Sequence, residues 1–324
     1  MKNKIKVGIV GYGNLGQGVE KAIAHHRDLE LVAVFTRRPR EIKTLSKAVS
    51  IDDIFTYQNA IDVLLLCGSS AGDLPHQGPL YAKAFNTVDS FDIHAEIPSY
   101  YAVMDNAAKS GNSLSIISIG WDPGLFSLAR LLFAGILPQG ESYTFWGKGV
   151  SQGHSTAVRQ VPGVKQAVQY TVPVRETVKQ IRQGLTPKLS PQEQHERICF
   201  VVPEPDADPK DIENSIKSMP GYFAGYNTTV HFISETEFAH EHTGMPHGGF
   251  VIRTGSTGTA DKQQMEFRLS LESNPEFTAS VLIAYARACH MLHKTGERGA
   301  RTIFDVPLGC LSPLSNSDLR KSLL

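Results

Sequence analysis

The stretch that decides the fold is Val7-Gly8-Ile9-Val10-Gly11-Tyr12-Gly13-Asn14-Leu15-Gly16, close to the start of the 324-residue chain. A short apolar run leads into a Gly-x-Gly-x-x-Gly turn, and residues 17–24 continue with helical spacing. In this order Gly11 permits the turn, Gly13 lets a pyrophosphate approach the backbone, and Gly16 lets the helix pack on the strand. Glycines also mark ordinary turns, but a position directly after an N-terminal strand favours a dinucleotide site at the helix N-terminus.

The composition describes a soluble globular protein and excludes several classes. The length indicates two domains. Equal numbers of basic and acidic residues, 32 each, argue against a nucleic-acid partner. Neither a bilayer-spanning run of roughly 20 apolar residues nor a signal peptide is expected. The four cysteines form no Cys-x-x-Cys pair and are expected as free thiols in a reducing cytoplasm.

A second buried strand, residues 31–35, ends in Thr36-Arg37-Arg38. About 20 residues after the glycine turn, an NAD site would carry an acidic residue that binds the ribose 2′-hydroxyl. Here a hydroxyl and two guanidinium groups offer donors and positive charge to a 2′-phosphate. A solvated basic turn is the alternative, but the diagnostic position favours NADP.

Further strands are predicted at residues 61–66, 87–92 and 114–119, with a helix over 98–110 that stops at Gly111. Alternating strands and helices predict an α/β, Rossmann-type, doubly wound parallel sheet that binds ligands at the carboxyl ends of its strands. Small and polar clusters fall at these ends, at residues 67–70, 90–92 and 121–124.

Two aspartates, Asp92 and Asp122, stand at such strand ends. An aspartate there is often a helix N-cap or a turn residue, and Asp122-Pro123-Gly124 is a good turn sequence. Their shared position at the expected reaction centre makes a catalytic role the competing interpretation.

The second half predicts a mostly antiparallel α+β domain for substrate binding and dimerisation. Strands are expected at residues 143–146, 168–172, 198–202, 229–233, 250–253 and 265–271, and helices at 124–134, 208–217 and 277–294. Asn274 and Pro275 precede the last helix, which is expected to pack back on the nucleotide domain. The predicted domains are therefore 1–120 plus 275–324, and 121–274.

The cluster His240-Glu241-His242-Thr243-Gly244-Met245-Pro246-His247-Gly248-Gly249 could present imidazoles to a metal. No established ligand spacing is present and hydride transfer needs no metal, so none is expected. A surface loop and a substrate-contacting loop are the alternatives, and residues 151–155 form a similar small, polar loop. Trp146 could equally be a core residue.

Several of these motifs together resemble the meso-diaminopimelate D-dehydrogenase family. The matching segments run from the first strand to the last helix: residues 11–16, 36–38, 89–92, 120–124, 145–147, 150–155, 162–164, 241–249 and 274–280. The resemblance implies a homodimeric, NADP-dependent enzyme of lysine biosynthesis. Its reaction is the reversible oxidative deamination of the D-centre of meso-2,6-diaminoheptanedioate to L-2-amino-6-oxoheptanedioate and ammonia.

The resemblance also implies roles for individual residues. Asp92 and Asp122 are the expected catalytic residues. The substrate is expected at Asp92, Trp121, Asp122, Trp146, Gln152 and Gly153 around its D-end, and at Thr171, Arg197, His247 and Asn274 around its L-end. The cofactor is expected along Tyr12, Gly13, Asn14, Leu15, Thr36, Arg37, Arg38, Cys67, Gly68, Ser69, Ser70, Ser90, Phe91, Asp92, Ile119, Gly120, Trp121, Asp122 and Pro123.

Two other functions stay open at this point. One is an NADP-dependent dehydrogenase of another amino acid or of a semialdehyde on the same fold. The other is an NADP-sensing protein without turnover. The paired strand-end aspartates and the set of groups suited to an amino acid end, Arg197 with Thr171 and His247, favour the enzyme.

Overall fold

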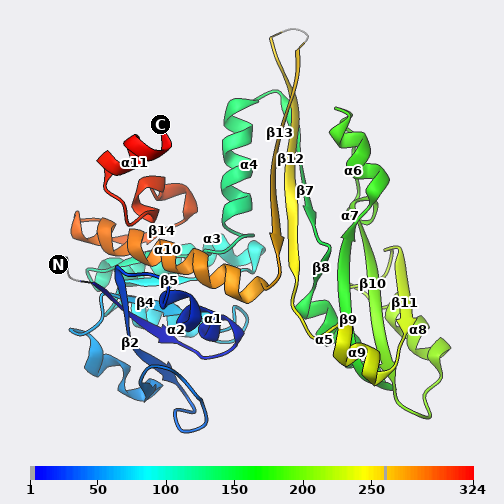
Figure 1. The fold of residues 1–324 in the computed structure, drawn as a ribbon, viewed down its shortest axis with the longest axis horizontal. Helices are drawn as coiled ribbons and strands as arrows, with labels where there is room; N and C mark the ends of the chain where they lie inside the picture. The colour runs from blue at the N-terminus through cyan, green and yellow to red at the C-terminus, as the bar shows by residue number, and fades with distance from the viewer. Residues whose placement is uncertain (1–3, 259–260) are drawn as a thin grey trace. The chain divides into compact units, whose positions relative to one another are not determined.

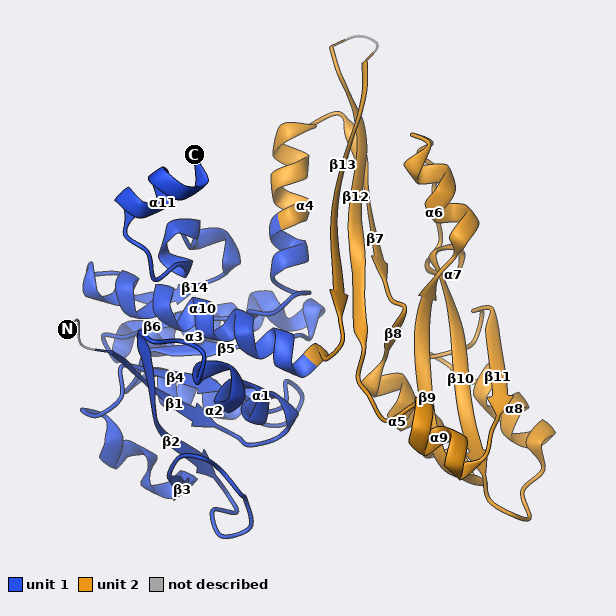
Figure 2. Cartoon of the chain, in the orientation of Figure 1, with its two compact units in different colours: residues 1–128, 275–324 blue, residues 129–274 orange. Residues whose placement is uncertain are grey.

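The computed structural model describes residues 4–258 and 261–324. The chain divides into two compact units, residues 1–128 with 275–324, and residues 129–274 (Figure 2). The sequence analysis placed the first of these limits at residue 120. Within the described residues, none of the helices combines the length and the apolar character that crossing a membrane requires.

The first unit contains a parallel sheet of seven strands among the described residues, in the order β14-β6-β5-β4-β1-β2-β3 (Figure 1). The strands are β1 (Ile5–Val10), β2 (Leu29–Thr36), β3 (Ala48–Ser50), β4 (Val63–Leu66), β5 (Thr87–Asp89), β6 (Leu114–Ile116) and β14 (Gly299–Arg301). The helices are α1 (Asn14–Ile23), α2 (Leu74–Ala82), α3 (Ile97–Ser110), the start of α4 (Leu125–Ile136), α10 (Asn274–Lys294) and α11 (Asn316–Leu323), with 3-10 turns η1 (Ile51–Tyr57), η2 (His94–Glu96), η3 (Ile303–Asp305) and η4 (Leu308–Leu311). The predicted Rossmann-type sheet is confirmed.

The near-continuous apolar strands of this sheet serve two cores, because alternate side chains point to opposite faces. Val63 and Leu65 pack in one core with Val19 of α1 and a row of α10 residues that includes Leu282. Leu64 and Leu66 pack in the other core with α2 and α3. The last helix therefore packs on the nucleotide-binding unit, as expected.

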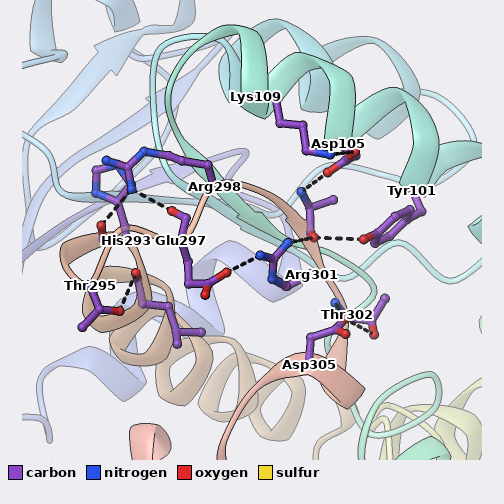
Figure 3. Close-up of polar contacts among 12 residues, drawn as sticks. Tyr101, Asp105, Lys109, His293, Thr295, Glu297, Arg298, Arg301, Thr302 and Asp305 are labelled. Atoms are coloured by element: carbon purple, nitrogen blue, oxygen red, sulfur yellow. Dashed lines mark hydrogen bonds and ion pairs between the residues drawn. The ribbon is translucent and has the colours of Figure 1, made fainter.

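The segment after α10 completes the sheet at β14, and polar contacts hold it there (Figure 3). Asp105 of α3 accepts a 2.9 Å hydrogen bond from the Ala300 nitrogen, and the Tyr101 hydroxyl donates to the Ala300 oxygen at 3.1 Å. Arg301 forms an ion pair with Glu297. The C-terminal segment is thus bound to α3 by hydrogen bonds between residues far apart in the sequence, which a local sequence pattern does not predict.

The second unit contains two sheets rather than one. Among the described residues they have the strand orders β11-β10-β9-β8 and β13-β12-β7, and every pairing except that of β10 with β11 is antiparallel. The strands are β7 (Gly140–Trp146), β8 (Gly149–Val150), β9 (Val164–Pro173), β10 (His195–Pro203), β11 (Thr228–Phe232), β12 (His247–Thr257) and β13 (Asp261–Leu271). The helices are α5 (Gln152–Arg159), α6 (Arg175–Arg182), α7 (Pro191–Gln194), α8 (Pro209–Lys217) and α9 (Glu235–Glu241).

Two loop predictions in this unit were wrong. Residues 152–155 form the first turn of α5, because Val158 farther along this helix is buried in the core with Val201 of β10. The cluster at 240–249 is likewise not one loop, since His240 lies in α9 and His247 begins β12. Tertiary packing overrides the loop-like composition of both segments.

Candidate active site

The glycine turn between β1 and α1 has the geometry that a dinucleotide site needs. Gly11 has a φ of +90°, which disfavours any side chain there. A Cβ at Gly16 would lie 2.2 Å from the Gly11 oxygen, so the helix packs against the turn only without one. A Cβ at Gly13 would meet no atom within 4 Å. The N-terminus of α1 thus faces open space at Gly13, where a pyrophosphate fits.

A cavity of about 580 Å³ opens in front of this turn. Its lining brings together eight of the predicted cofactor residues: Tyr12, Gly13, Thr36, Arg37, Arg38, Cys67, Gly68 and Ser69. Asn14 and Leu15 begin α1 beside it, and Ser70 continues the loop after Ser69. Ile42, Ile51, Asp73 and Gln77 also line the cavity and were not predicted. Asp73 precedes α2, a helix that the sequence analysis did not predict.

The end of β2 carries the positive charge of this cavity. Thr36 is buried and its hydroxyl accepts a hydrogen bond from the Arg38 nitrogen at 3.3 Å. The Arg37 guanidinium lies 3.4 Å from the Asp73 carboxylate. Hydrogen bonds from Ser69 and the charge of Arg37 keep the pKa of Asp73 below its usual range despite partial burial. Both guanidinium groups are largely exposed, so they are free to turn toward a 2′-phosphate.

Asp89 joins the loops that follow β5 and β6. Its carboxylate accepts hydrogen bonds of 3.0 Å from the Phe91 and Ser118 nitrogens and 2.9 Å from the Tyr100 hydroxyl. These bonds take the backbone donors away from the sheet, which explains why both strands end earlier than predicted. Burial raises the pKa of Asp89 to about 6. Asp92, two residues beyond Ser90, donates from its nitrogen to the Ser70 hydroxyl at 3.1 Å and so lies near the cavity loop.

The loop after β6 contains the predicted cofactor residues 119–123, which include Trp121 and Asp122. The Ile119 nitrogen donates to the Asp89 oxygen at 2.8 Å. Trp121 is buried and meets Phe126 edge-on at 5.3 Å, and Asp122 lies in the turn beside it. Gly124 closes that turn, since a Cβ there would lie 1.8 Å from the Gly120 oxygen.

In the second unit, Arg197 is a buried guanidinium that has no carboxylate partner within residues 4–258 and 261–324. It lies opposite Thr171 in the β9–β10 pair and donates to the Thr171 hydroxyl at 2.6 Å. Its Cζ stands 4.3 Å from the centre of the Tyr226 ring. The buried Nε has no hydrogen-bond partner, and Arg197 forms no ion pair with any described residue. Burial lowers the pKa of this group, so an anionic ligand would relieve a real desolvation cost.

His247 and Trp146 are connected to this strand pair through Gly149 and His195. Thr171 pairs on its other side with Gly149, where a Cβ would lie 2.5 Å from the His247 ring. The Trp146 ring stacks on His195 at 5.3 Å, and the Trp146 backbone nitrogen donates to His195 Nε2 at 2.9 Å. Trp146 is 38% exposed, so it is no core tryptophan. Burial and the nearby Arg197 lower the pKa of His195 to about 4.

Two further predicted substrate residues, Gln152 and Asn274, contact Met245. The Gln152 amide donates to the Met245 sulfur at 3.4 Å, and the Asn274 nitrogen donates to the Met245 oxygen at 3.1 Å. Gly153 has open space where a side chain would stand. Within the second unit, Thr171 thus contacts Arg197 directly, Gly149 lies between Thr171 and His247, and Met245 links Gln152 to Asn274.

Sequence reasoning missed His195 and Tyr226 in this group. His195 stands two residues before Arg197 on one strand, so period-2 alternation places both side chains on the same face. That spacing was a usable signal. No sequence signal marks Tyr226, because it contacts Arg197 from a separate loop.

The histidines of the former metal hypothesis have other contacts. The Tyr170 hydroxyl lies 3.0 Å from His242 Nδ1, and Phe200 stacks on the His242 ring at 4.1 Å. Across residues 4–258 and 261–324, no three side chains of histidine, cysteine, aspartate or glutamate are grouped to hold a metal ion.

The fold and the cavity define a protein of the dinucleotide-binding class. Residues 120–273 match the family model of the diaminopimelic acid dehydrogenase C-terminal domain. The meso-diaminopimelate D-dehydrogenase of Ureibacillus thermosphaericus is 58% identical over 99% of this chain and 100% of its own length. That of Corynebacterium glutamicum is 45% identical over 97% of this chain and 98% of its own. The chain belongs to the meso-diaminopimelate D-dehydrogenase family.

Solved structures agree with this assignment. The C. glutamicum diaminopimelate dehydrogenase in complex with diaminopimelate superposes with a TM-score of 0.92 at 45% identity, covering 100% of both chains. An engineered D-amino acid dehydrogenase bound to NADP⁺ gives a TM-score of 0.87 at 43% identity, covering 99% of this chain and 100% of that one.

Proposed function

We propose that this chain oxidises the D-amino acid centre of meso-diaminopimelate with NADP⁺. The products are L-2-amino-6-oxoheptanedioate and ammonia, the reaction is reversible, and it serves lysine biosynthesis. Full-length similarity to enzymes of this name supports the proposal. The observation that carries it is the buried Arg197, which donates a hydrogen bond to the Thr171 hydroxyl but has no carboxylate partner among the described residues.

The substrate has two chemically identical ends of opposite handedness. Discrimination must therefore come from fixing the end that does not react. Arg197 suits the L-carboxylate as a guanidinium fork, helped by Thr171 and His247, while Asn274 addresses the L-ammonium. Because His195 is kept neutral, it adds no charge beside Arg197 and its proton-free Nε2 stays bonded to Trp146.

Binding at the L-end then places the D-α-carbon for reaction, so that remote binding energy serves orientation. Asp92 and Asp122 accept hydrogen bonds from the D-ammonium and favour the iminium that develops as hydride leaves. One of them first takes up a proton from the D-ammonium, because the lone pair of the free amine must form the C=N bond of the iminium as the hydride leaves. Water then hydrolyses the iminium and ammonia is released. Trp121, Trp146, Gln152 and Gly153 are the further residues that we propose to contact this end of the substrate.

NADP⁺, when bound, supplies the hydride acceptor. The chain's part is to hold it: the N-terminus of α1 at Gly13 suits the pyrophosphate, and Thr36, Arg37 and Arg38 suit the 2′-phosphate. The strand-end segments 67–70, 90–92 and 119–123 would lie along the remainder. Cys67 stays an uncharged lining group, since burial raises the pKa of its thiol to about 12.

We further propose a homodimer in the cytoplasm. Support for the dimer comes from α4, where Leu131, Leu132 and Ile136 are each more than half exposed. Exposed large apolar side chains on one helix are typical of a surface that a second chain covers. Support for the compartment comes from Cys67, Cys199, Cys289 and Cys310, all free thiols.

An isotope experiment tests which end reacts. Meso-diaminopimelate with deuterium at the D-α-carbon should transfer the label to the reduced cofactor, whereas deuterium at the L-α-carbon should remain in the product. Mass spectrometry of both compounds reads the result. Label from the L-centre in the cofactor would overturn the assignment of Arg197 to the L-end.

A further inference from the structure

The chain that leaves the 2′-phosphate residues has little regular structure of its own. After Arg38, residues 39–47 run to β3 in turns and bends, and Ile42 from this segment lines the cofactor cavity. Arg37 and Arg38 are exposed at the start of the segment. Something else must therefore fix its path.

The side chain of Glu20 in α1 binds this segment through hydrogen bonds. Although it is a carboxylate, its residue is only 6% exposed. It accepts hydrogen bonds from the Thr44 hydroxyl, from the Leu45 nitrogen at 3.0 Å and from the Ser46 nitrogen at 3.2 Å. Three consecutive residues of the segment thus donate to one side chain of the helix.

The same carboxylate reaches the glycine turn. The Tyr12 hydroxyl donates to Glu20, and the same hydroxyl oxygen lies 3.1 Å from the Lys43 oxygen. Tyr12 lines the cofactor cavity between Gly11 and Gly13. Glu20 therefore joins two parts of the cavity wall that are far apart in sequence, the turn of residues 11–13 and the segment after Arg38.

Among the described residues, these hydrogen-bond donors stabilise the negative charge of Glu20. Burial opposes ionisation, but the hydrogen bonds of Thr44, Tyr12 and the two backbone nitrogens lower the pKa of the carboxyl below its usual value. No lysine, arginine or histidine among the described residues forms an ion pair with it. Bonds to an ionised acceptor are about twice as strong as neutral ones, so the carboxylate is well suited to hold an irregular segment in one path.

We propose that Glu20 is a positioning residue for NADP⁺ selectivity. Glu20 is not among the residues that line the cofactor cavity. It acts through Tyr12 and through the segment that follows Arg37 and Arg38, because the fixed path of this segment positions the 2′-phosphate site. This inference rests on the NADP-dependent activity proposed above. Its specific consequence is that losing the charge of Glu20 harms NADP⁺ use more than NAD⁺ use.

The test compares Glu20→Gln with Thr44→Val, which removes one donor from the segment and leaves the helix intact. Glu30→Gln, an exposed glutamate of β2, is the matched control. The readouts are kcat and KM for NADP⁺, NAD⁺ and meso-diaminopimelate, together with NADPH and NADH titrations followed by nucleotide fluorescence. Circular dichroism establishes that each variant is folded.

For Glu20→Gln we expect KM for NADP⁺ to rise about tenfold, with kcat and KM for diaminopimelate changed less than twofold. The ratio of kcat/KM for NADP⁺ to that for NAD⁺ should fall about tenfold. Thr44→Val should shift it in the same direction by a smaller factor, and Glu30→Gln should not shift it.

Equal losses with NADP⁺ and NAD⁺, or an unchanged ratio in both variants, would overturn the proposal. If Glu20→Gln failed to fold, an unchanged ratio in Thr44→Val would have the same meaning. The titrations separate this result from a failure of the proposed function. A wild-type chain without turnover would still show whether Glu20→Gln weakens NADPH binding more than NADH binding.

Discussion

Arg197 and Thr171 stand directly opposite each other in β10 and β9, joined by a 2.6 Å hydrogen bond from the guanidinium to the hydroxyl. Neighbouring strand residues on one face are close whatever the rest of the fold does. The pair is thus a preformed, buried donor group, and we propose that the substrate carboxylate is its partner.

Replacing this guanidinium should weaken diaminopimelate use selectively. Arg197→Lys loses the planar fork of donors, and we expect kcat/KM for meso-diaminopimelate to fall by about 100-fold. For Thr171→Val we expect a fall of about tenfold. Both estimates follow from the roughly 1.5–3 kcal/mol that a hydrogen bond to a charged group contributes. NADPH affinity should stay within twofold in both. Arg159→Lys in α5 is the control. If Arg197→Lys or Thr171→Val lost NADPH affinity together with diaminopimelate turnover, the role of this pair would be structural.

Gly13 and Gly16 make a matched pair for the cofactor site. The methyl group of Gly13→Ala would have no atom within 4 Å, so the melting temperature should not change. NADPH affinity should fall at least tenfold, because the methyl group occupies the space in which the pyrophosphate is expected. Gly16→Ala places its Cβ 2.2 Å from the Gly11 oxygen and should destabilise the fold as well. Thermal melting and NADPH titration check both. Normal NADPH binding by Gly13→Ala would place the pyrophosphate elsewhere.

His195 predicts a loss of stability in weak acid. Its pKa is about 4 in the folded chain and about 6.5 when unfolded, so the unfolded chain takes up the proton first as the pH falls. Its contribution is complete above about pH 6.5 and is lost progressively down to about pH 4. From pH 7 to pH 5 the loss should be about 2 kcal/mol.

His195→Gln keeps an acceptor for the Trp146 nitrogen but cannot titrate. Its urea-unfolding midpoint should therefore change less between pH 7 and pH 5 than that of the wild type. The exposed His25→Gln is the control and should retain the wild-type pH dependence. An unaltered dependence in His195→Gln would mean that other groups cause the acid loss.

Asp122→Asn tests the proton acceptor. We expect kcat to fall at least 100-fold with unchanged NADPH affinity, because an amide cannot take up the ammonium proton. Asp92→Asn should show a smaller loss if it only accepts a hydrogen bond. The pH profiles of kcat report the role. Turnover and a pH profile equal to those of the wild type would remove Asp122 from the mechanism.

The sequence predicted the nucleotide-binding fold well because its signals are local. The apolar runs of β1, β2 and β4, the glycine turn and the Thr36–Arg38 segment all read directly from short stretches, and the structure places the last two in one cavity. The family assignment is confirmed, whereas the roles of individual residues remain predictions.

The parts that were missed depend on contacts between distant segments. Glu20 looks like an ordinary helix residue until Tyr12 and Thr44 are placed against it. Asp73, directly before α2, and Gln77 of α2 line the cavity, and Pro79 inside this helix weakens its helical pattern. In the second unit, alternation predicted the strands but could not show that they separate into two sheets.

The most direct measurement is the initial rate of NADPH formation with meso-, LL- and DD-diaminopimelate and with simple D-amino acids, each with NADP⁺ and NAD⁺. We predict turnover of the meso isomer with NADP⁺, little or none with the LL isomer, and a much lower kcat/KM with NAD⁺. Absence of turnover with every one of these compounds, despite tight NADPH binding, would contradict the proposed reaction.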